Sequence, residues 1–408
     1  MQHRYQCVVA GGGPAGLMAG VLLARAGVDV VILEKHADFL RDFRGGTIHP
    51  STMTVMDELG WLDEFLALPH HRVRELFAQF ANERVKLADF AGLPVKTPYI
   101  AMMPQWDFLS FLANKGRLYR NFSLMMSTEA TDLLFDDGRV VGVVAKRPGE
   151  DLITLSGDLV VAADGRGSCL RDRAALKTID LGAPMDVMWF RLPRHLGDTP
   201  ETQGRFDAGH VFIVLNRGDY WQCAFVIAKG LNEQVRSAGI EAFRARLGPL
   251  LPFEAARLQA IRSWDQVALL SVKVDRLERW AKPGLLCIGD AAHAMSPVGG
   301  VGVNLAVQDA VAAANILATP LRMRKVTLSD LISVQERRQF PTRLTQRLQI
   351  GVQNTIIKKA LGDSRPIKPP LLLRALLATP YLSQLPARIV GLGVRPEHVS
   401  DEIRNAIG

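Results

Sequence analysis

The chain alternates between short apolar runs and amphipathic stretches, a pattern typical of a mixed α/β protein. Residues 5–10 and 28–33 are mainly apolar, as expected for strands buried on both faces. Residues 14–26 between them have helical spacing and end at Gly27, so the segment predicts a β-α-β unit. Further strands are expected over 123–130, 139–146, 158–163 and 284–288, with a hairpin turn at 136–138.

A strand-rich segment covers residues 181–264, with strands expected over 185–192, 210–216 and 220–228 and a helix over 240–247. Residues 76–98 are expected to add to the same sheet. The predicted fold is therefore a Rossmann-like α/β domain with an inserted β-sheet domain and a helical C-terminus. The expected divisions are 1–75, 99–180 and 265–350 for the first domain, 76–98 and 181–264 for the inserted domain, and 351–408 for the C-terminal region.

Composition narrows the function classes. The net charge is +8, but the basic residues are spread along the 408 residues and no nucleic-acid motif accompanies them, so no nucleic-acid partner is expected. The four cysteines form no C-x-x-C pair, and neither a metal site nor a redox dithiol is expected. The first residues enter a strand without an apolar signal region, which favours a cytoplasmic protein.

Residues 11–16 have the spacing G-x-G-x-x-G, directly after a strand and at the start of a helix. Gly11 permits a tight turn, Gly13 lets the backbone approach a pyrophosphate, and Gly16 lets helix and strand pack closely. A carboxylate at Glu34, after the second strand, can accept hydrogen bonds from ribose hydroxyls. This motif predicts a dinucleotide without distinguishing FAD from NAD, and its predicted contacts are Gly11, Gly13, Pro14, Ala15, Gly16, Glu34 and Lys35.

Two later segments carry further motifs. Residues 163–171 have the sequence ADGRGSCLR, and residues 289–293 have the sequence GDAAH, followed by a glycine-rich loop over 297–304. These motifs, in this order and over about residues 4–345, resemble the para-hydroxybenzoate-hydroxylase-like flavoprotein monooxygenases. The resemblance implies that FAD is the cofactor, with Asp290 on its ribityl chain and the glycine-rich loop against its flavin ring.

The local chemistry agrees with that assignment. Asp290 can accept from ribityl hydroxyls, and backbone N–H groups at a helix start near Leu305 can donate to the flavin C2 carbonyl. Pro297 stiffens the loop, while His293 is interpreted as a structural residue. The resemblance adds Arg44 and Gln105 as FAD contacts. The remaining predicted cofactor-binding residues are Arg44, Gln105, Asp164, Asp290, Gly300, Gly302, Val303 and Asn304, and Arg44 and Pro297 are predicted to act in catalysis.

The resemblance implies hydroxylation of an aromatic or polycyclic substrate with NADPH or NADH and O2, through a flavin C4a-hydroperoxide. Strand alternation in the inserted sheet places the predicted substrate residues on shared faces, although which face meets the flavin stays open. The alternatives are an FAD-dependent reductase or epoxidase of an isoprenoid or lipid, and an FAD-binding protein without catalysis. The predicted substrate residues are Phe212 and Val214 on one strand, and Trp221, Cys223 and Phe225 on the next.

The C-terminal region contains a basic stretch, residues 364–396, which has no Asp or Glu and several leucine runs. Such a segment can lie on a membrane surface, pack on its own protein, or contact a second subunit of a homodimer. The sequence leaves these three alternatives open.

Overall fold

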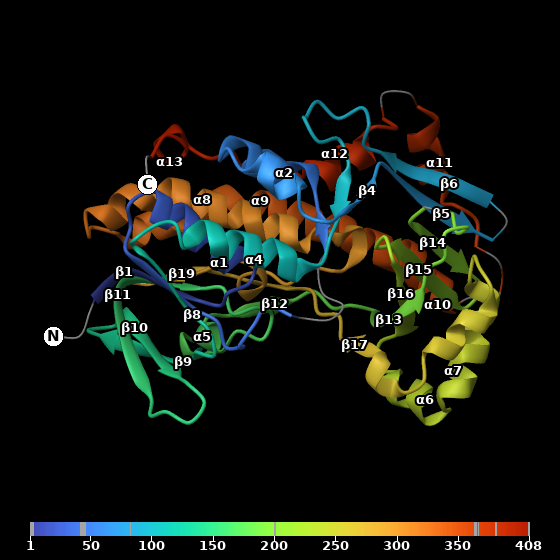
Figure 1. Cartoon of the computed structure of the whole chain (residues 1–408), viewed down its shortest axis with the longest axis horizontal. Coiled ribbons are helices and arrows are strands. Elements are labelled where there is room, and N and C mark those ends of the chain that lie inside the picture. Colours follow the sequence, from blue (N-terminus) through green and yellow to red (C-terminus); the bar gives the residue numbers. More distant parts are fainter. Residues whose placement is uncertain are drawn as a thin grey trace.

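The computed structural model describes residues 4–40, 46–81, 83–199, 201–362, 365, 367–379 and 382–406. Two β-sheets with their helices make up most of this part of the chain (Figure 1). The first sheet lies beneath several long helices, and the second sheet lies at the opposite end of the molecule (Figure 1). The predicted mixed α/β fold is confirmed.

The first sheet has eight strands in the described part of the chain, and its central strands are parallel. β1 (Arg4–Ala10) lies between β2 (Val30–Leu33) and β11 (Ile153–Ala162), and β11 also pairs with β20 (Leu285–Cys287). These strands are apolar and largely buried, as parallel strands covered on both faces must be. The other strands are β8 (Phe122–Met125), β9 (Glu129–Asp136), β10 (Arg139–Lys146) and β19 (Ala281–Lys282).

Long helices cover one side of the first sheet (Figure 1). α1 (Pro14–Arg25) connects β1 to β2 and packs against α4 (Gln105–Gly116) and α8 (Gly302–Arg322). α9 (Leu328–Val352) packs along α8. Smaller helices of this part are α2 (Pro50–Glu58), α3 (Leu62–Leu66), α5 (Cys169–Arg173) and α13 (Asp401–Arg404).

Two predicted elements of the first sheet's part differ from the structure. The single strand expected over 123–130 is wrong, because β8 and β9 are separated by a turn at 126–128. Ser127 N donates to His36 O (2.9 Å) and Thr128 N donates to Glu34 O (2.8 Å), so these residues bond to the segment after β2. α8 begins at Gly302 rather than near Leu305, which brings the end of the glycine-rich loop into its first turn.

The second sheet has seven strands among the described residues, in the order β17-β13-β16-β15-β14-β5-β6. Three of them closely follow the predicted ranges: β13 (Met185–Pro193), β15 (His210–Asn216) and β16 (Tyr220–Ala228). β17 (Ala268–Leu270) also joins this sheet, although residues 265–350 were expected in the first domain. The remaining strands are β5 (Glu75–Phe80), β6 (Glu83–Asp89) and β14 (Gln203–Asp207).

The two faces of the second sheet contact different parts of the protein. On what we call the outer face, Phe225 packs edge-on against Phe243 of α7 (Ile240–Leu247), with ring centroids 5.9 Å apart. On the opposite, inner face, Val226 belongs to a cluster against which Val298 of the glycine-rich loop packs. The inner face therefore lies toward the loop that the sequence assigns to the flavin.

Shorter elements connect these layers. β3 (Thr47–Ile48), β7 (Ile100–Met102) and β4 (His71–Val73) form one small sheet, and β12 (Thr178–Asp180) pairs with β18 (Asp275–Leu277). The remaining short helices are α6 (Asn232–Ser237), α10 (Lys358–Gly362), η1 (Gly248–Leu250), η2 (Ala255–Ala260), η3 (Trp264–Gln266), η4 (Gly289–Ala291), η5 (Val298–Gly300) and η6 (Gln353–Ile357).

The C-terminal region folds back on the body of the protein. α12 (Leu385–Gly391) packs on β6, and Arg374 of α11 (Leu371–Ala378) pairs with Glu83 of β6. Leu371 nevertheless keeps 82% of its surface exposed. Part of the basic stretch thus packs on its own chain, while membrane contact and a homodimer stay predictions.

One helical stretch, Val298–Arg322, is long and apolar enough to cross a membrane by length and composition. Within its most apolar window, 78% is buried inside the protein. Its apolar residues belong to the same hydrophobic core as the strands of the first sheet, as expected for a buried helix of a globular protein.

Candidate active site

The three sequence motifs meet at one edge of the first sheet. Ala10 pairs with Leu33 on one side and with Ala162 on the other, and Ala162 pairs with Cys287. These residues end or nearly end four parallel strands, so the segments that follow them emerge side by side. Binding sites in open parallel sheets form at such carboxyl ends.

In the glycine turn after β1, Gly11 and Gly16 have no room for a side chain, whereas Gly13 has open space beside it. A Cβ on Gly16 would lie 1.9 Å from Gly11 O, and a Cβ on Gly11, where φ is +108°, would lie 2.3 Å from Ala163 O. Beside Gly13, by contrast, there is no heavy atom within 4 Å of a Cβ among the described residues. Gly13 is also the N-cap of α1 and supplies no side chain, so the helix start can accept a phosphate.

Glu34 and Lys35 follow β2 at the same edge. The Glu34 carboxylate is buried, and it accepts hydrogen bonds from Gly12 N (2.9 Å) and His36 N (3.0 Å). These bonds fix the acid against the glycine turn. Lys35 is exposed and has Glu129 4.0 Å away. The geometry thus suits Glu34 for a ribose contact more directly than Lys35.

Asp164 and Asp290 are brought together by a residue that the sequence analysis missed. Arg166 Nη2 donates to Asp290 Oδ2 (3.0 Å), which joins the second and third motifs. Arg166 Nη1 and Asp164 Oδ1 are buried and have no hydrogen-bond partner within the described part of the protein. Burial also raises the pKa of Asp164, against weaker lowering by hydrogen bonds from Ser168 and Leu170. Such unpaired groups suit a polar cofactor, and the position of Arg166 inside the segment ADGRGSCLR was the available signal.

His293 belongs to a buried network behind this edge. Its Nε2 lies 2.6 Å from Asp309 Oδ2, and Arg338 Nε donates to the other carboxylate oxygen (3.1 Å). Gly289 N also donates to Asp309 (3.1 Å), so the network holds the start of the GDAAH segment. Although burial alone would raise the pKa of Asp309, His293 and Arg338 together lower it. This arrangement supports the structural interpretation of His293.

The glycine-rich loop is anchored by main-chain contacts. Pro297 is the N-cap of η5, and the Gly300 carbonyl accepts from Thr47 Oγ1 (2.9 Å). His49 lies between two carbonyls, with Nδ1 2.7 Å from Val390 O and Nε2 3.1 Å from Gly300 O. Burial lowers the pKa of His49, with opposing effects from those two carbonyls. The loop is thereby tied both to β3 and to α12.

The first turn of α8 leaves its main chain available. The helix has no side-chain cap, and an added Cβ on Gly302 would meet no described heavy atom within 4 Å. The Asn304 side chain is already engaged, because its Oδ1 accepts from Ser51 Oγ (2.7 Å) and Thr52 Oγ1 (2.8 Å). Val303 and Asn304 can therefore serve a ligand through their backbone N–H groups, and their contact with the flavin stays a prediction.

Two predicted contacts are less defined. Arg44 lies outside the described residues, so its assignment stays a prediction. Gly46, two residues later, accepts a hydrogen bond from Arg217 Nη1 at the β15–β16 turn, and Arg217 Nε donates to Gln222 (2.8 Å). Burial lowers the pKa of Arg217 to about 10. Gln105 is the first residue of α4, and its contact with FAD stays a prediction.

The predicted substrate residues lie on the outer face. All five belong to the buried cluster that packs against α7, away from the face on which Val298 packs. Strand alternation puts them on one side, and α7 covers that side. The sequence left open which face these residues occupy, and their contact with the substrate stays a prediction. The residues concerned are Phe212, Val214, Trp221, Cys223 and Phe225.

The inner face carries different side chains. Trp189 on β13 packs with the inner-face cluster, and its Nε1 is buried with no hydrogen-bond partner in the described residues. Gln222 on β16 is 5% exposed and bonds to Arg217. An indole N–H without an acceptor is a donor that a substrate oxygen can satisfy. No sequence signal separated this face from the other.

Comparison with known proteins decides the family. A family model described as "FAD binding domain" matches residues 4–348. The 6-methylpretetramide 4-monooxygenase of Streptomyces rimosus is 31% identical over 353 residues, covering 85% of this chain and 83% of that protein. The chain belongs to the FAD-dependent aromatic-ring hydroxylases. FAD is therefore its cofactor, and it is an FAD-dependent monooxygenase.

Two further proteins resemble the chain more distantly. The anhydrotetracycline hydroxylase OxyS of Streptomyces rimosus has the same fold, with a TM-score of 0.76, 22% identity, and coverage of 98% of this chain and 78% of that one. A digeranylgeranylglycerophospholipid reductase of Methanothrix thermoacetophila is 23% identical over 355 residues, covering 82% of this chain and 83% of that protein. The resemblance to the reductase is thus weaker than the resemblance to the pretetramide monooxygenase.

Proposed function

We propose that this monooxygenase hydroxylates a polycyclic aromatic substrate, with NADPH or NADH as reductant and O2 as oxidant. The observation that carries the proposal is the arrangement of the three motifs at one sheet edge, beside a loop whose Val298 packs against the cluster to which the inner face of the second sheet contributes. The relative that acts on 6-methylpretetramide supports a substrate with several fused rings.

The described residues fit FAD. Gly13 and the first turn of α1 would take the pyrophosphate, and Glu34 would accept from the adenosine ribose. Asp290 would accept from the ribityl hydroxyls, with Arg166 holding its other side. The first-turn N–H groups of α8 would donate to the flavin carbonyl. When bound, FAD supplies the redox chemistry and the activation of O2, which protein side chains do not provide.

The substrate would lie between the glycine-rich loop and the inner face. There Trp189 Nε1 would donate to a carbonyl or phenolate oxygen and thereby fix the orientation of the ring. The Arg217–Gly46 contact would hold the β15–β16 turn of the second sheet against Gly46, which follows Arg44 by two residues in the sequence. The packed second sheet and α12 would exclude water from this space, which protects a reactive oxygen donor from wasteful side reactions.

We infer transient binding of NADPH or NADH, since the sequence has no second G-x-G-x-x-G turn to hold it. We also propose that the protein is located in the cytoplasm. The homodimer and the membrane contact of the C-terminal stretch stay proposals that sedimentation and vesicle binding would test.

The decisive experiment is turnover of a panel of polycyclic phenols under ¹⁸O2, followed by mass spectrometry. We expect one product to gain a single labelled oxygen only when enzyme, reductant and substrate are all present. Free FAD with the same reductant is the control. A product that gains or loses two hydrogens, without label, would favour the reductase or desaturase reaction instead.

A further inference from the structure

Three glutamines on one side of α9 and of the turn that follows it hold the segment that leads into the glycine-rich loop. Gln346, Gln349 and Gln353 are spaced at i, i+3 and i+7 and are 0%, 4% and 1% exposed. The buried face of such a helix is ordinarily apolar, because a buried amide must find hydrogen-bond partners. Here those partners belong to residues 294–298, which lie 51–57 residues earlier in the sequence.

Gln349 pairs the main chain of this segment from both sides. Its Nε2 donates to Ser296 O (2.9 Å) and to Val298 O (2.7 Å), and its Oε1 accepts from Ser296 N (3.2 Å). Ser296 belongs to no helix or strand, so its polar groups depend on such a partner. An amide both donates and accepts, whereas an ionised carboxylate only accepts and an aliphatic side chain does neither.

Gln353 connects the same segment to the second sheet. Its Nε2 donates to Ser296 Oγ, which in turn accepts from Val298 N (3.3 Å). Gln353 is the first residue of η6, a π-helical turn, and Ile357 at the end of that turn belongs to the inner-face cluster. π-Helical turns that continue an α-helix are frequent at functional sites. One turn therefore contacts the loop segment at its start and the inner face at its end.

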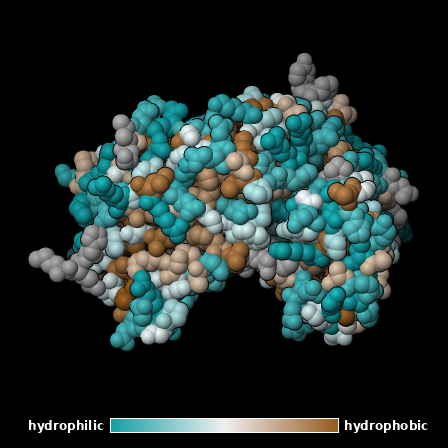
Figure 2. Space-filling view, in the orientation of Figure 1, coloured by the Kyte–Doolittle hydropathy of each residue, from teal (hydrophilic) through white to brown (hydrophobic). Residues whose placement is uncertain are grey.

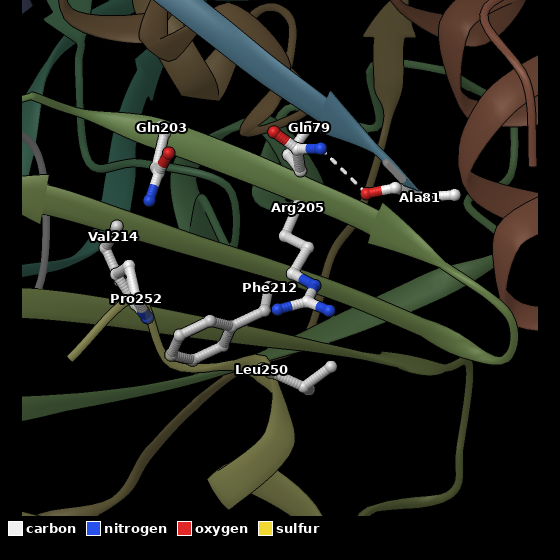
Figure 3. A pocket seen from close by; sticks show the side chains of 8 residues that line it. All are labelled: Gln79, Ala81, Gln203, Arg205, Phe212, Val214, Leu250 and Pro252. Carbon is white, nitrogen blue, oxygen red and sulfur yellow. Dashed lines mark hydrogen bonds between the residues drawn. The ribbon is translucent and has the colours of Figure 1, made fainter. Parts of the chain in front are cut away.

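Glutamines on the outer face of the second sheet make contacts of a different kind. Gln79 and Gln203 border a cavity of about 250 Å³ on that face (Figure 3). Gln79 Nε2 donates to Ala81 O (2.7 Å), which is only two residues away (Figure 3). This contact shapes the turn after its own strand, whereas those of Gln349 and Gln353 determine where a distant segment lies.

We infer that Gln349 and Gln353 are positioning residues of the oxygenation site. They hold residues 296–298, so that the glycine-rich loop, whose other end is tied through Gly300, keeps one position beside the inner face. The inference rests on the proposed function, which assigns the space between this loop and the inner face to the substrate. Without the Gln349 amide, the main chain of the loop would turn to water for partners, and fewer molecules would have the loop where FAD requires it.

The test measures Gln349→Met and Gln353→Met by equilibrium titration of the apoprotein with FAD and by iodide quenching of bound-FAD fluorescence. Gln349→Met should lower FAD affinity about tenfold, the net contribution of a few neutral hydrogen bonds, and should make the flavin more accessible to iodide. Gln353→Met should change both in the same direction by a smaller factor. It loses one hydrogen bond, while the buried Gln353 Oε1 has no partner among the described residues. This milder variant decides the matter if Gln349→Met fails to fold.

Gln335→Met is the matched control, because Gln335 also lies on α9 and pairs main-chain groups from both sides, away from the loop. Its Oε1 accepts from Trp280 N (2.9 Å) and its Nε2 donates to Glu278 O (2.9 Å). The control should lose stability in thermal melts and keep wild-type FAD affinity and iodide quenching. Wild-type values in both loop variants, or equal changes in the control, would overturn the inference. The ¹⁸O2 experiment tests the proposed function separately, because labelled product can be absent while flavin quenching still responds to Gln349.

Discussion

The carboxyl edge of the first sheet and the second sheet offer functional groups of different kinds. At the edge, they are largely main-chain atoms and absent side chains, as at Gly13 and Gly302. On the second sheet, they are side chains whose use depends on the face they occupy, with Trp189 inside and Phe225 outside. The edge is suited to a cofactor common to the family, and the second sheet to a substrate particular to each member. Figure 2 shows a notch along the lower margin of the molecule, which separates the lobes to which the two regions belong.

The largest effect is expected from the outer face of the second sheet. Phe225→Ala should lower the free energy of unfolding by about 3–5 kcal/mol, because Phe225 is fully buried against Phe243. Denaturant unfolding measures this loss. FAD content and turnover per folded molecule should stay close to wild type.

The inner-face counterpart sharpens the comparison. Trp189→Phe keeps most of the volume and removes the unpaired N–H, so stability should change little while substrate-stimulated flavin reduction weakens. Stopped-flow reduction at several substrate concentrations measures the effect. If Phe225→Ala alters substrate response and Trp189→Phe does not, the substrate lies on the outer face.

At the edge of the first sheet, Gly16→Ala should both destabilise the protein, by about 1–3 kcal/mol, and abolish FAD retention. The reason is the 1.9 Å approach of the added Cβ to Gly11 O, which as backbone has little room to move. Gly13→Ala is the matched variant. Its apoprotein should melt like wild type while its FAD affinity falls; equal melting losses in both would contradict the pyrophosphate assignment.

A side-chain contact at the same edge should matter for the cofactor alone. Asp290→Ala should weaken FAD binding about tenfold to a hundredfold, the value of a charge-assisted hydrogen bond of about 1.5–3 kcal/mol. Equilibrium titration of apoprotein with FAD measures it. His293→Ala should instead reduce stability through Asp309, with a smaller change in FAD affinity. A larger loss of FAD affinity in His293→Ala than in Asp290→Ala would show that His293, and not Asp290, contacts the cofactor.

The smallest expected effect depends on pH. Because burial lowers the pKa of His49 in the folded protein, the unfolded chain takes up a proton more readily below about pH 6.5. The stabilisation is complete above that pH and declines as pH falls toward the folded-state pKa. His49→Asn should flatten this decline between about pH 7 and 5 in thermal melts. Parallel curves for both proteins would show that other groups control the slope.

The sequence predicted what depends on local backbone geometry. The turn at 11–16 and the helix after it are encoded by glycine spacing and short apolar runs, as is the strand predicted over 158–163, which forms the end of β11 (Ile153–Ala162). The same holds for β15 and β16, whose predicted ranges match the structure.

Long-range pairing escaped prediction. Arg166 and Asp290 are 124 residues apart, and the sequence around either residue does not indicate the other as its partner. Alternation grouped Phe212 with Val214 correctly, but both sheet faces are apolar, so it carried no information about which one α7 covers. Both features depend on tertiary packing, which the pattern of apolar and polar residues along the sequence does not specify.

The position of β20 between β11 and β19 also has a consequence for synthesis. β1 and β2 leave the ribosome early, yet the strand carrying Leu285–Cys287 emerges only after most of the chain has been made. Until then Val160–Ala162 of β11 have no partner strand on that side, although β10 already pairs with the start of β11, and open strand edges are prone to aggregate. A chain that stops before β20 also lacks Asp290 and the whole of α8. Capture of FAD would therefore distinguish complete chains from prematurely terminated ones.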